Sequence, residues 1–401
     1  MGFETFNLHP SVMAGVRALG YVTPTPIQLQ SIPLIMQGRD LIGLAQTGTG
    51  KTAAFALPVL QRLLRGPRGR VGALIISPTR ELAEQTCEAI GELGRQTGLR
   101  SIAIYGGVSL GQQICGLRSG AEIVVACPGR LLDHIWQGTI DLSHVEVLVI
   151  DEADRMFDMG FLPDIRGILR CMINPRQTLL FSATMPDDIR LLVQDTLHDP
   201  VTVQIGRTLP ATTVSHALYP VEPHLKTALL LELLRRTEME SVLVFTRTKH
   251  RAERVARLLE KAGYNATSLQ GDLSQCRRQA ALDGFRAGRY KILVATEIAA
   301  RGIDVLRISH VINYDMPGST DAYIHRIGRT GRVDRTGDAF TFVTGEDAAM
   351  VHALEQIVNT RLERHTLQGF DYTVSASKSE FTHSPRQWRR RTVQRERIGN
   401  R

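Results

Sequence analysis

The chain has 401 residues, of which 43% are hydrophobic, and a formal net charge of +8. This length exceeds the usual size of one hydrophobic core, so two globular domains are expected. No stretch approaches the roughly 18 apolar residues that span a bilayer, and Glu4 stands where a secretory segment would be basic or apolar. The five cysteines form no C-x-x-C pair, which argues against a disulfide framework. These features exclude a membrane-spanning class and predict a soluble cytoplasmic protein.

Short β-branched runs alternate with amphipathic helical segments in both halves, which predicts an α/β fold with two tandem, mainly parallel sheets. Predicted strands lie at residues 40–44, 73–77, 123–126, 145–150, 178–181, 241–245, 291–295, 310–314 and 339–344. Predicted helices include 52–64 and 80–97. Gly206, Pro210, Pro220 and Pro223 punctuate a stretch with little periodicity, so the expected parts are 1–206, a linker at 207–223, and 224–372.

The positive charge is concentrated in the last part of the chain. Residues 378–401 hold eight basic residues and two acidic ones, a net charge of +6. Hydrophobic content falls after Tyr372, so we expect a basic, disordered tail at 373–401. Trp388 beside three arginines favours nonspecific RNA tethering by this tail. A solubilising tail without a fixed ligand is an equally good explanation by composition.

A glycine-rich loop joins the predicted strand 40–44 to the predicted helix 52–64, which is the context of a phosphate-binding loop. Backbone N–H groups of such a loop bind phosphate oxygens, while Lys51 can reach the outer phosphates and the Thr52 hydroxyl can ligate magnesium. Ala45 replaces the first glycine of the general pattern. A glycine-rich turn before an ordinary helix is the minor alternative. The predicted nucleotide-binding residues are Gln46, Thr47, Gly48, Thr49, Gly50, Lys51 and Thr52.

Further along, the apolar run 145–150 ends in Asp151-Glu152-Ala153-Asp154. A buried strand that ends in two carboxylates can deliver Asp151 to magnesium, partly through water, and Glu152 to the water that attacks the phosphate. An acidic pair can also cap a following helix, but the upstream loop favours nucleotide hydrolysis. A nucleoside triphosphate and magnesium are therefore the expected ligands.

With these motifs, the chain resembles a DEAD-box RNA helicase, whose name is spelled at residues 151–154, over about residues 3 to 372. The sequences at 245–250 and 369–372 are most similar to the bacterial RhlE-like branch. The resemblance implies two RecA-like domains and ATP-dependent, local, largely sequence-independent unwinding of RNA duplexes or remodelling of ribonucleoproteins. Ribonucleoprotein or ribosome-assembly proteins are possible partners, no membrane is involved, and a monomer is the default.

The resemblance also implies roles in ATP binding and hydrolysis. Within an adenine-reading element at 20–28, Gln28 contacts the adenine edge, and Phe3 upstream stacks on the ring. Asp304 in the second half contacts the ribose. Two arginines three apart at a helix end lie on one face and suit a phosphate that gains charge. By resemblance they are the arginine fingers, and the second-half catalytic residues are His325, Arg329 and Arg332.

By the same resemblance, Ser182 and Thr184 couple hydrolysis to strand separation through hydrogen bonds toward Asp154 and His325. Because the phosphate loop and the arginines lie in different halves, hydrolysis should require closure of the cleft between the domains.

An RNA-binding surface is implied as well, made of short elements in both domains. Small residues let backbone N–H groups approach phosphates, and arginines add charge. Few bulky aromatic residues occur there, so we expect backbone contacts with little sequence preference. Each element alone is better explained as a helix cap or a turn. The residues are Pro78, Thr79, Arg80, Gly107, Gly129, Arg130, Thr246, Arg247, Gly271, Arg278 and Thr296.

Three positions depart from the family pattern: Cys127 stands for Thr, Gln270 for His, and Glu297 for Asp. None removes a catalytic group, so we expect altered RNA affinity and retained activity. Three other functions stay open: an ATP-gated RNA clamp without productive unwinding, a DNA translocase of the same superfamily, and a small-molecule kinase. The kinase ranks last because it leaves Arg329 and Arg332 without a role.

Overall fold

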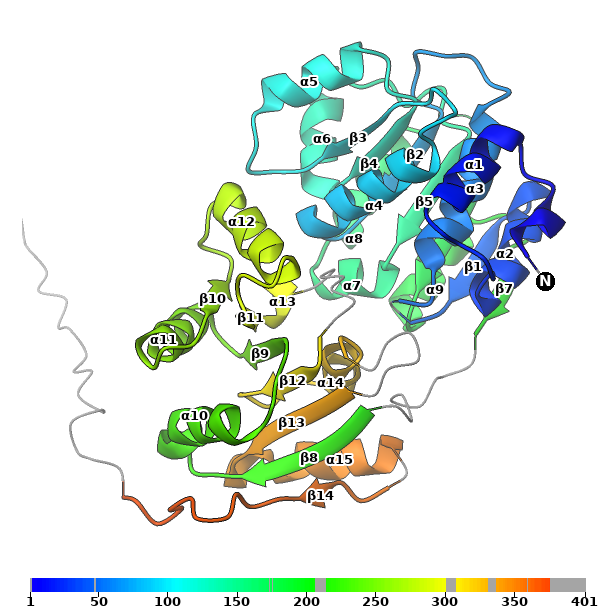
Figure 1. Cartoon of the computed structure of the whole chain (residues 1–401). Helices are drawn as coiled ribbons and strands as arrows, with labels where there is room; N and C mark the ends of the chain where they lie inside the picture. Colours follow the sequence, from blue (N-terminus) through cyan, green and yellow to red (C-terminus); the bar gives the residue numbers. More distant parts are fainter. Residues whose placement is uncertain are drawn as a thin grey trace, which may run out of the picture.

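The structure is a computed structural model that describes residues 2–46, 48–172, 174, 176–205, 214–300, 308–330, 337–358 and 360–375. Two sheets of 7 strands each form the centres of two domains, and the strand pairs among the described residues are all parallel (Figure 1). The first sheet has the order β3-β4-β2-β5-β6-β1-β7. Its strands are β1 Leu41–Leu44, β2 Ala73–Ile76, β3 Ser101–Ile104, β4 Ile123–Ala126, β5 Val147–Asp151, β6 Gln177–Ser182 and β7 Val201–Gln204.

Helices cover both faces of this first sheet. They are η1 Phe3–Phe6, α1 Pro10–Ala18, α2 Pro26–Met36, α3 Lys51–Leu63, α4 Arg80–Leu93, α5 Leu110–Arg118, α6 Pro128–Trp136, α7 Ala153–Asp158, α8 Leu162–Arg170 and α9 Asp187–Thr196. Alternate strand residues point to opposite faces, so Ile75 packs with helices α1 to α4 while its neighbour Leu74 packs with α6 to α9. Burial on both faces explains why the strands read as continuous apolar runs.

The second sheet has the order β10-β11-β9-β12-β13-β8-β14. Its strands are β8 Val214–Pro220, β9 Val242–Thr246, β10 Ala266–Leu269, β11 Ile292–Thr296, β12 His310–Asn313, β13 Gly337–Val343 and β14 Glu363–Arg364. The surrounding helices are η2 Pro223–Leu225, α10 Lys226–Arg236, α11 Lys249–Lys261, α12 Gln275–Arg286, α13 Glu297–Ala300, α14 Thr320–Ile327, η3 Gly345–Asp347 and α15 Ala348–Val358. The architecture confirms the predicted fold class.

All nine predicted strands are present, with ends within two residues of those expected. The sequence analysis missed β3, β7, β8, β10 and β14, which are short or carry polar residues. It also extended the helix α4 too far, since that helix ends at Leu93 and Gly94 forms its C-cap. Long apolar runs are therefore easier to recognise than the short strands that accompany them.

The predicted linker at 207–223 needs correction. Residues 214–220 form β8, which pairs along its whole length with β13, from Gly337 opposite Val214 to Val343 opposite Pro220. The prolines suggested a linker, but Pro220 is the last residue of the strand, where a proline is tolerated. Residues 206–213 lie outside the described residues, as does the predicted tail from 376 onward. No described helix combines the length and apolar character needed to cross a bilayer.

Asp40 connects three strands at the amino edge of the first sheet. Its buried carboxylate accepts hydrogen bonds from the backbone N–H of Thr178 at 2.7 Å and of His198 at 2.6 Å. In parallel sheets the carboxyl ends of the strands lie at the opposite edge, where ligand sites occur. Asp40 therefore contributes to the frame and lies away from that edge.

We expect Asp40→Ala to lower the free energy of unfolding of the first domain by about 2 to 4 kcal/mol, because one buried and one part-buried amide lose their charged acceptor. Asp40→Asn keeps one acceptor oxygen and should lose about half as much. The matched control is Asp199→Ala, which removes a highly exposed ion pair with Arg39 and should cost less than about 1 kcal/mol. Urea unfolding followed by circular dichroism measures all three, and equal losses for Asp40→Ala and Asp199→Ala would contradict this role.

Candidate active site

The phosphate-binding loop lies between β1 and α3, as predicted. Gly48 and Gly50 have φ angles of +87° and +92°, which favour glycine, and α3 begins at Lys51. The buried Lys51 donates from Nζ to the carbonyl of Ala45 at 3.0 Å, and Thr49 donates to the carbonyl of Gln46 at 2.8 Å. Backbone N–H groups at a helix N-terminus beside a lysine make a suitable phosphate site. Thr47 lies outside the described residues.

Gln28 contacts this loop directly. Its Nε2 donates to the carbonyl of Gly50 at 3.1 Å, and its Oε1 accepts from the N–H of Thr25 at 2.9 Å. A Cβ atom at Gly50 would lie 2.5 Å from Gln28 Nε2, so only glycine fits there. The predicted adenine-reading element and the phosphate loop are therefore one packed unit.

Phe3 lies differently from the prediction. The short helix η1 turns its ring into the core, where only 2% of Phe3 is exposed. The ring stacks on Tyr21, with centroids 6.1 Å apart, and 43% of Tyr21 is exposed. In this arrangement Phe3 has no free face for an adenine ring, and Tyr21 is the exposed aromatic residue beside it. Sequence alone gave no sign of which ring faces outward.

The acidic pair lies at the carboxyl end of β5. Asp151 is the last strand residue, and Glu152 has a φ of +53°, an uncommon conformation for a side-chain-bearing residue. The N–H of Glu152 donates to Asp151 Oδ1 at 3.0 Å. Arg155 Nη1 lies 2.6 Å from Glu152 Oε2, with the two side chains 3% and 4% exposed. The sequence analysis missed Arg155, because nothing in its spacing distinguishes it from a surface arginine.

The two carboxyls of this pair have opposite pKa shifts. Burial raises the pKa of Asp151 to about 6, against the opposing charge of Lys51. Burial also disfavours ionisation of Glu152, but the charges of Arg155, Lys51 and Arg329 outweigh it and lower the pKa. Glu152 is therefore ionised at neutral pH and can accept a hydrogen bond from water.

Helix α14 of the second domain brings its basic residues to the same place. Arg329 is buried, and its Nε donates to the carbonyl of His325 at 3.3 Å. Burial, together with the charge of Arg155, lowers the pKa of His325 to about 4, so the imidazole is neutral at pH 7. The charge of Arg329 lowers the pKa of Glu152, so predicted residues of the two domains lie within electrostatic range of each other. Arg332 and Asp304 lie outside the described residues.

The predicted coupling loop contacts Asp154. Asp154 Oδ2 accepts from the N–H of Ala183 at 3.1 Å and from the N–H of Thr184 at 3.0 Å. The Ser182 hydroxyl accepts from the N–H of Asp154 at 3.2 Å and donates to the carbonyl of Thr184 at 2.7 Å. The hydrogen bonds expected between Asp154 and this loop are thus present. His325 is linked to Asp154 by charge.

In the first domain, two arginines converge over the predicted RNA-contacting loop. A Cβ at Gly107 would collide with the guanidinium of Arg80, and one at Gly106 would lie 3.5 Å from Arg80 Nη2 and 4.0 Å from Arg130 Nη2. Gly107 has a φ of +88°. Pro78 and Thr79 are buried, and Thr79 caps α4 by accepting from the N–H of Leu82, while Gly129 is exposed. The arginines and glycines form the accessible part of this set.

In the second domain, the prediction that the Thr246 side chain contacts RNA is wrong. Thr246 is 0% exposed and donates to the carbonyl of Thr248 at 3.2 Å, so its side chain is not available to RNA. Arg247 and Gly271 are exposed, and Thr296 is half-buried. Arg278 pairs at 2.7 Å with the buried Glu81 of the first domain, so its guanidinium joins α12 to α4 (Figure 1). The exposed residues Arg247 and Gly271 remain consistent with phosphate contact.

The donor set fits a magnesium nucleotide. Magnesium prefers oxygen ligands, which the Thr52 hydroxyl and the Asp151 carboxylate supply. The pKa of Asp151 is raised because burial disfavours its charge more than nearby Lys51 favours it. A divalent cation beside Asp151 can supply the additional positive charge that keeps this carboxylate ionised. Lys51 and the N-terminus of α3 lie at the adjoining phosphate loop.

Comparisons with known proteins agree with this geometry. Residues 25–192 match the DEAD/DEAH box helicase family and residues 225–334 the helicase conserved C-terminal domain. The ATP-dependent RNA helicase CshA of Listeria monocytogenes is 43% identical over 362 residues, which cover 90% of this chain and 69% of the relative. For the ATP-dependent RNA helicase DeaD of Mycobacterium tuberculosis the identity is 44% over 387 residues, covering 95% and 68%. The structure of S. cerevisiae Dbp5 bound to RNA and ADP BeF3 has a TM-score of 0.82 at 30% identity and covers 91% of this chain and 95% of that one.

Proposed function

The chain belongs to the DEAD-box ATP-dependent RNA helicases, and we propose that it hydrolyses ATP between its two sheets and uses domain closure to strain short RNA duplexes apart. The observation that carries the proposal is the environment of Glu152. This carboxylate is buried and ionised, held by Arg155 at 2.6 Å, and influenced by Arg329 of the other domain. A water-orienting carboxylate thus shares one site with a cation suited to transition-state charge.

Each side chain of the site then has a defined task. Lys51 and the backbone of the phosphate loop bind the outer phosphates, and Gln28, the proposed contact of the adenine edge, holds the loop through the carbonyl of Gly50. Thr52 and Asp151 would hold magnesium, which would supply positive charge to the phosphates when bound. Glu152 orients the attacking water, and Arg329, with Arg332, stabilises the charge that develops on the transferred phosphate.

RNA is the proposed partner, held through its phosphates. Arg80 and Arg130 lie over Gly106 and Gly107 in the first domain, and Arg247 is exposed in the second. Contacts to phosphates position a strand without reading its sequence, so little sequence preference is expected. The relative Dbp5 was solved with RNA and ADP BeF3, which supports this assignment.

Several narrower predictions remain proposals. Assignment to the RhlE-like branch rests on residues 245–250 and 369–372, whereas the relatives above are named CshA and DeaD. We propose a first helicase domain that ends near residue 206, a second domain that includes β8, and a basic tail. We also propose that the protein is a monomer in the cytoplasm. An ATP-gated clamp would share the whole site, and a strand-displacement assay distinguishes it from a helicase.

We expect Glu152→Gln to bind ATP with nearly unchanged affinity and to slow hydrolysis by about 10²- to 10⁴-fold, because the amide no longer accepts strongly from the attacking water. RNA-stimulated ATPase and nucleotide binding measure the two effects. Glu146→Gln, on the surface before the same strand, is the matched control and should retain activity. Near-normal hydrolysis in Glu152→Gln would disprove the role of Glu152.

Arg155→Ala should make hydrolysis depend on pH near neutrality. Arg155 lowers the pKa of Glu152, so its removal raises that pKa and leaves less of the carboxylate ionised at pH 7. Activity of the variant should recover as the pH rises through the raised pKa. Arg155→Lys keeps the charge and should follow the wild-type profile. Identical pH–rate profiles for wild type and Arg155→Ala would refute the electrostatic role.

RNA should stimulate the ATPase more strongly than DNA of the same sequence, since the 2′-hydroxyl distinguishes them. Equal stimulation would favour the DNA translocase.

A version ending at Tyr372 tests the tail. If residues 373–401 tether RNA, the full-length protein should reach half-maximal ATPase stimulation at a lower RNA concentration than the shortened version at low salt, and this difference should fade as the salt concentration rises. Equal responses of both versions across salt concentrations would reject tethering.

A further inference from the structure

We propose that Asp315 is a positioning residue that joins the RNA-contacting turn after β9 to the arginine-bearing helix α14, so that RNA binding reaches the ATP site through the interior of the second domain. The inference rests on the proposed function and adds a residue to it. Asp315 lies two residues beyond β12, at the carboxyl edge of the sheet, and is 2% exposed.

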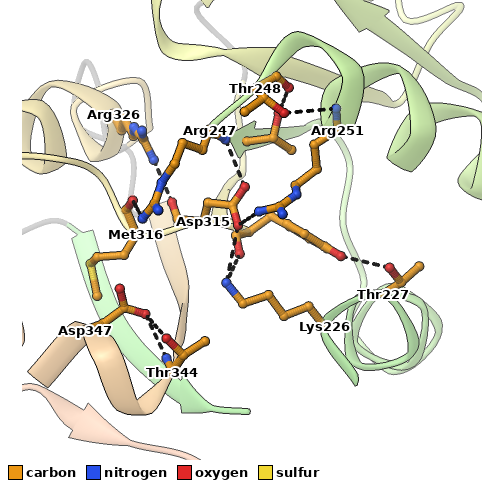
Figure 2. Close-up of polar contacts among 12 residues, drawn as sticks. Lys226, Thr227, Arg247, Thr248, Arg251, Asp315, Met316, Arg326, Thr344 and Asp347 are labelled. Atoms are coloured by element: carbon orange, nitrogen blue, oxygen red, sulfur yellow. Dashed lines mark hydrogen bonds and ion pairs between the residues drawn. The ribbon is translucent and has the colours of Figure 1, made fainter. Parts of the chain in front are cut away.

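The Asp315 carboxylate accepts from three separate elements (Figure 2). Arg251 Nη1 of α11 lies 2.6 Å from Oδ1, and Lys226 Nζ of α10 lies 3.3 Å from the same atom. The backbone N–H of Arg247, in the turn after β9, donates to Oδ2 at 2.9 Å. One buried carboxylate therefore fixes the backbone of the exposed Arg247 against two helices.

The backbone of Asp315 makes the other half of the connection. Its carbonyl accepts from Arg326 Nη1 at 2.9 Å, and its N–H donates to the carbonyl of Phe245 at 3.2 Å. Arg326 also pairs with Glu297 at 3.0 Å and lies over the Phe245 ring, 5.1 Å from its centroid. Arg326 stands next to His325 on α14, one turn before Arg329.

The charges explain why an aspartate is required. Lys226 and Arg326 are buried, and burial lowers the pKa of each, against the opposing charges of Asp315 and Glu297 respectively. A buried cation without its partner is costly, so loss of the Asp315 charge would force the surrounding groups apart. Because buried polar networks are rigid, a phosphate that pulls on the turn at Arg247 would move Asp315 and, through its carbonyl, Arg326.

The test is Asp315→Asn in the full chain. The amide can satisfy one donor through its oxygen, while its NH2 group faces cations that can only donate. We expect the RNA concentration for half-maximal ATPase stimulation to rise about tenfold. The RNA-independent ATPase rate and the KM for ATP should stay within about twofold of the wild-type values. A merely structural defect would instead lower the RNA-independent and the RNA-stimulated ATPase together.

Asp338→Asn is the matched control, because Asp338 lies in the same sheet but at the amino end of β13, at the edge opposite Asp315, and pairs with His310 at 3.5 Å. It should leave RNA stimulation unchanged. An unchanged RNA requirement in a folded Asp315→Asn protein would overturn the inference. A wild-type chain that RNA does not stimulate would instead overturn the proposed function.

Should Asp315→Asn fail to fold, Arg251→Gln carries the test. The Arg251 side chain is 48% exposed, so its substitution disturbs the core little while removing the shortest ion pair of Asp315. We expect the RNA requirement to rise about threefold with an unchanged RNA-independent rate. A folded Arg251→Gln protein with a wild-type RNA requirement would equally reject the connection.

Discussion

The ion pair between Glu152 and Arg155 is the interaction on which the site depends. A carboxylate buried at the end of a strand would ordinarily hold a proton, because burial disfavours its charge. Arg155 at 2.6 Å reverses that preference and also holds the side chain of a residue whose backbone has a φ of +53°. Arg155, three residues after Glu152 in α7, makes the largest contribution to keeping this carboxylate ionised, and Lys51 and Arg329 add to it.

The remaining charges of the site come from two sheets, and neither sheet is sufficient alone. The first provides the phosphate loop, Asp151 and Glu152, and the second provides His325 on α14 and Arg329 just after that helix. Parallel strands bring their carboxyl ends to one edge, so facing edges of two such sheets naturally assemble a site from distant parts of the chain. The pair of Arg278 with Glu81 joins the same two domains through α12 and α4.

The second domain adds connections that belong to no nucleotide motif. Asp315 links the turn after β9, α10 and α11 through its carboxylate and α14 through its carbonyl. Asp315, Lys226 and Arg326 are buried and each has a charged or polar partner, which makes this part of the network rigid. An RNA-facing turn and an ATP-facing helix in one domain can thus respond together.

The sequence by itself determined the fold class, nine strands and the phosphate loop, because apolar runs and glycine-rich turns act locally on the backbone. The tertiary structure alone decided which side chains are buried and paired. In the tertiary structure, Phe3 and Thr246 are buried, and residues of the expected linker form β8. Arg278 pairs with Glu81, and Arg155 and Asp315 each take part in a group of buried charges. Burial and pairing depend on contacts between residues far apart in the chain, so the spacing of neighbouring residues does not predict which side chains are buried or paired.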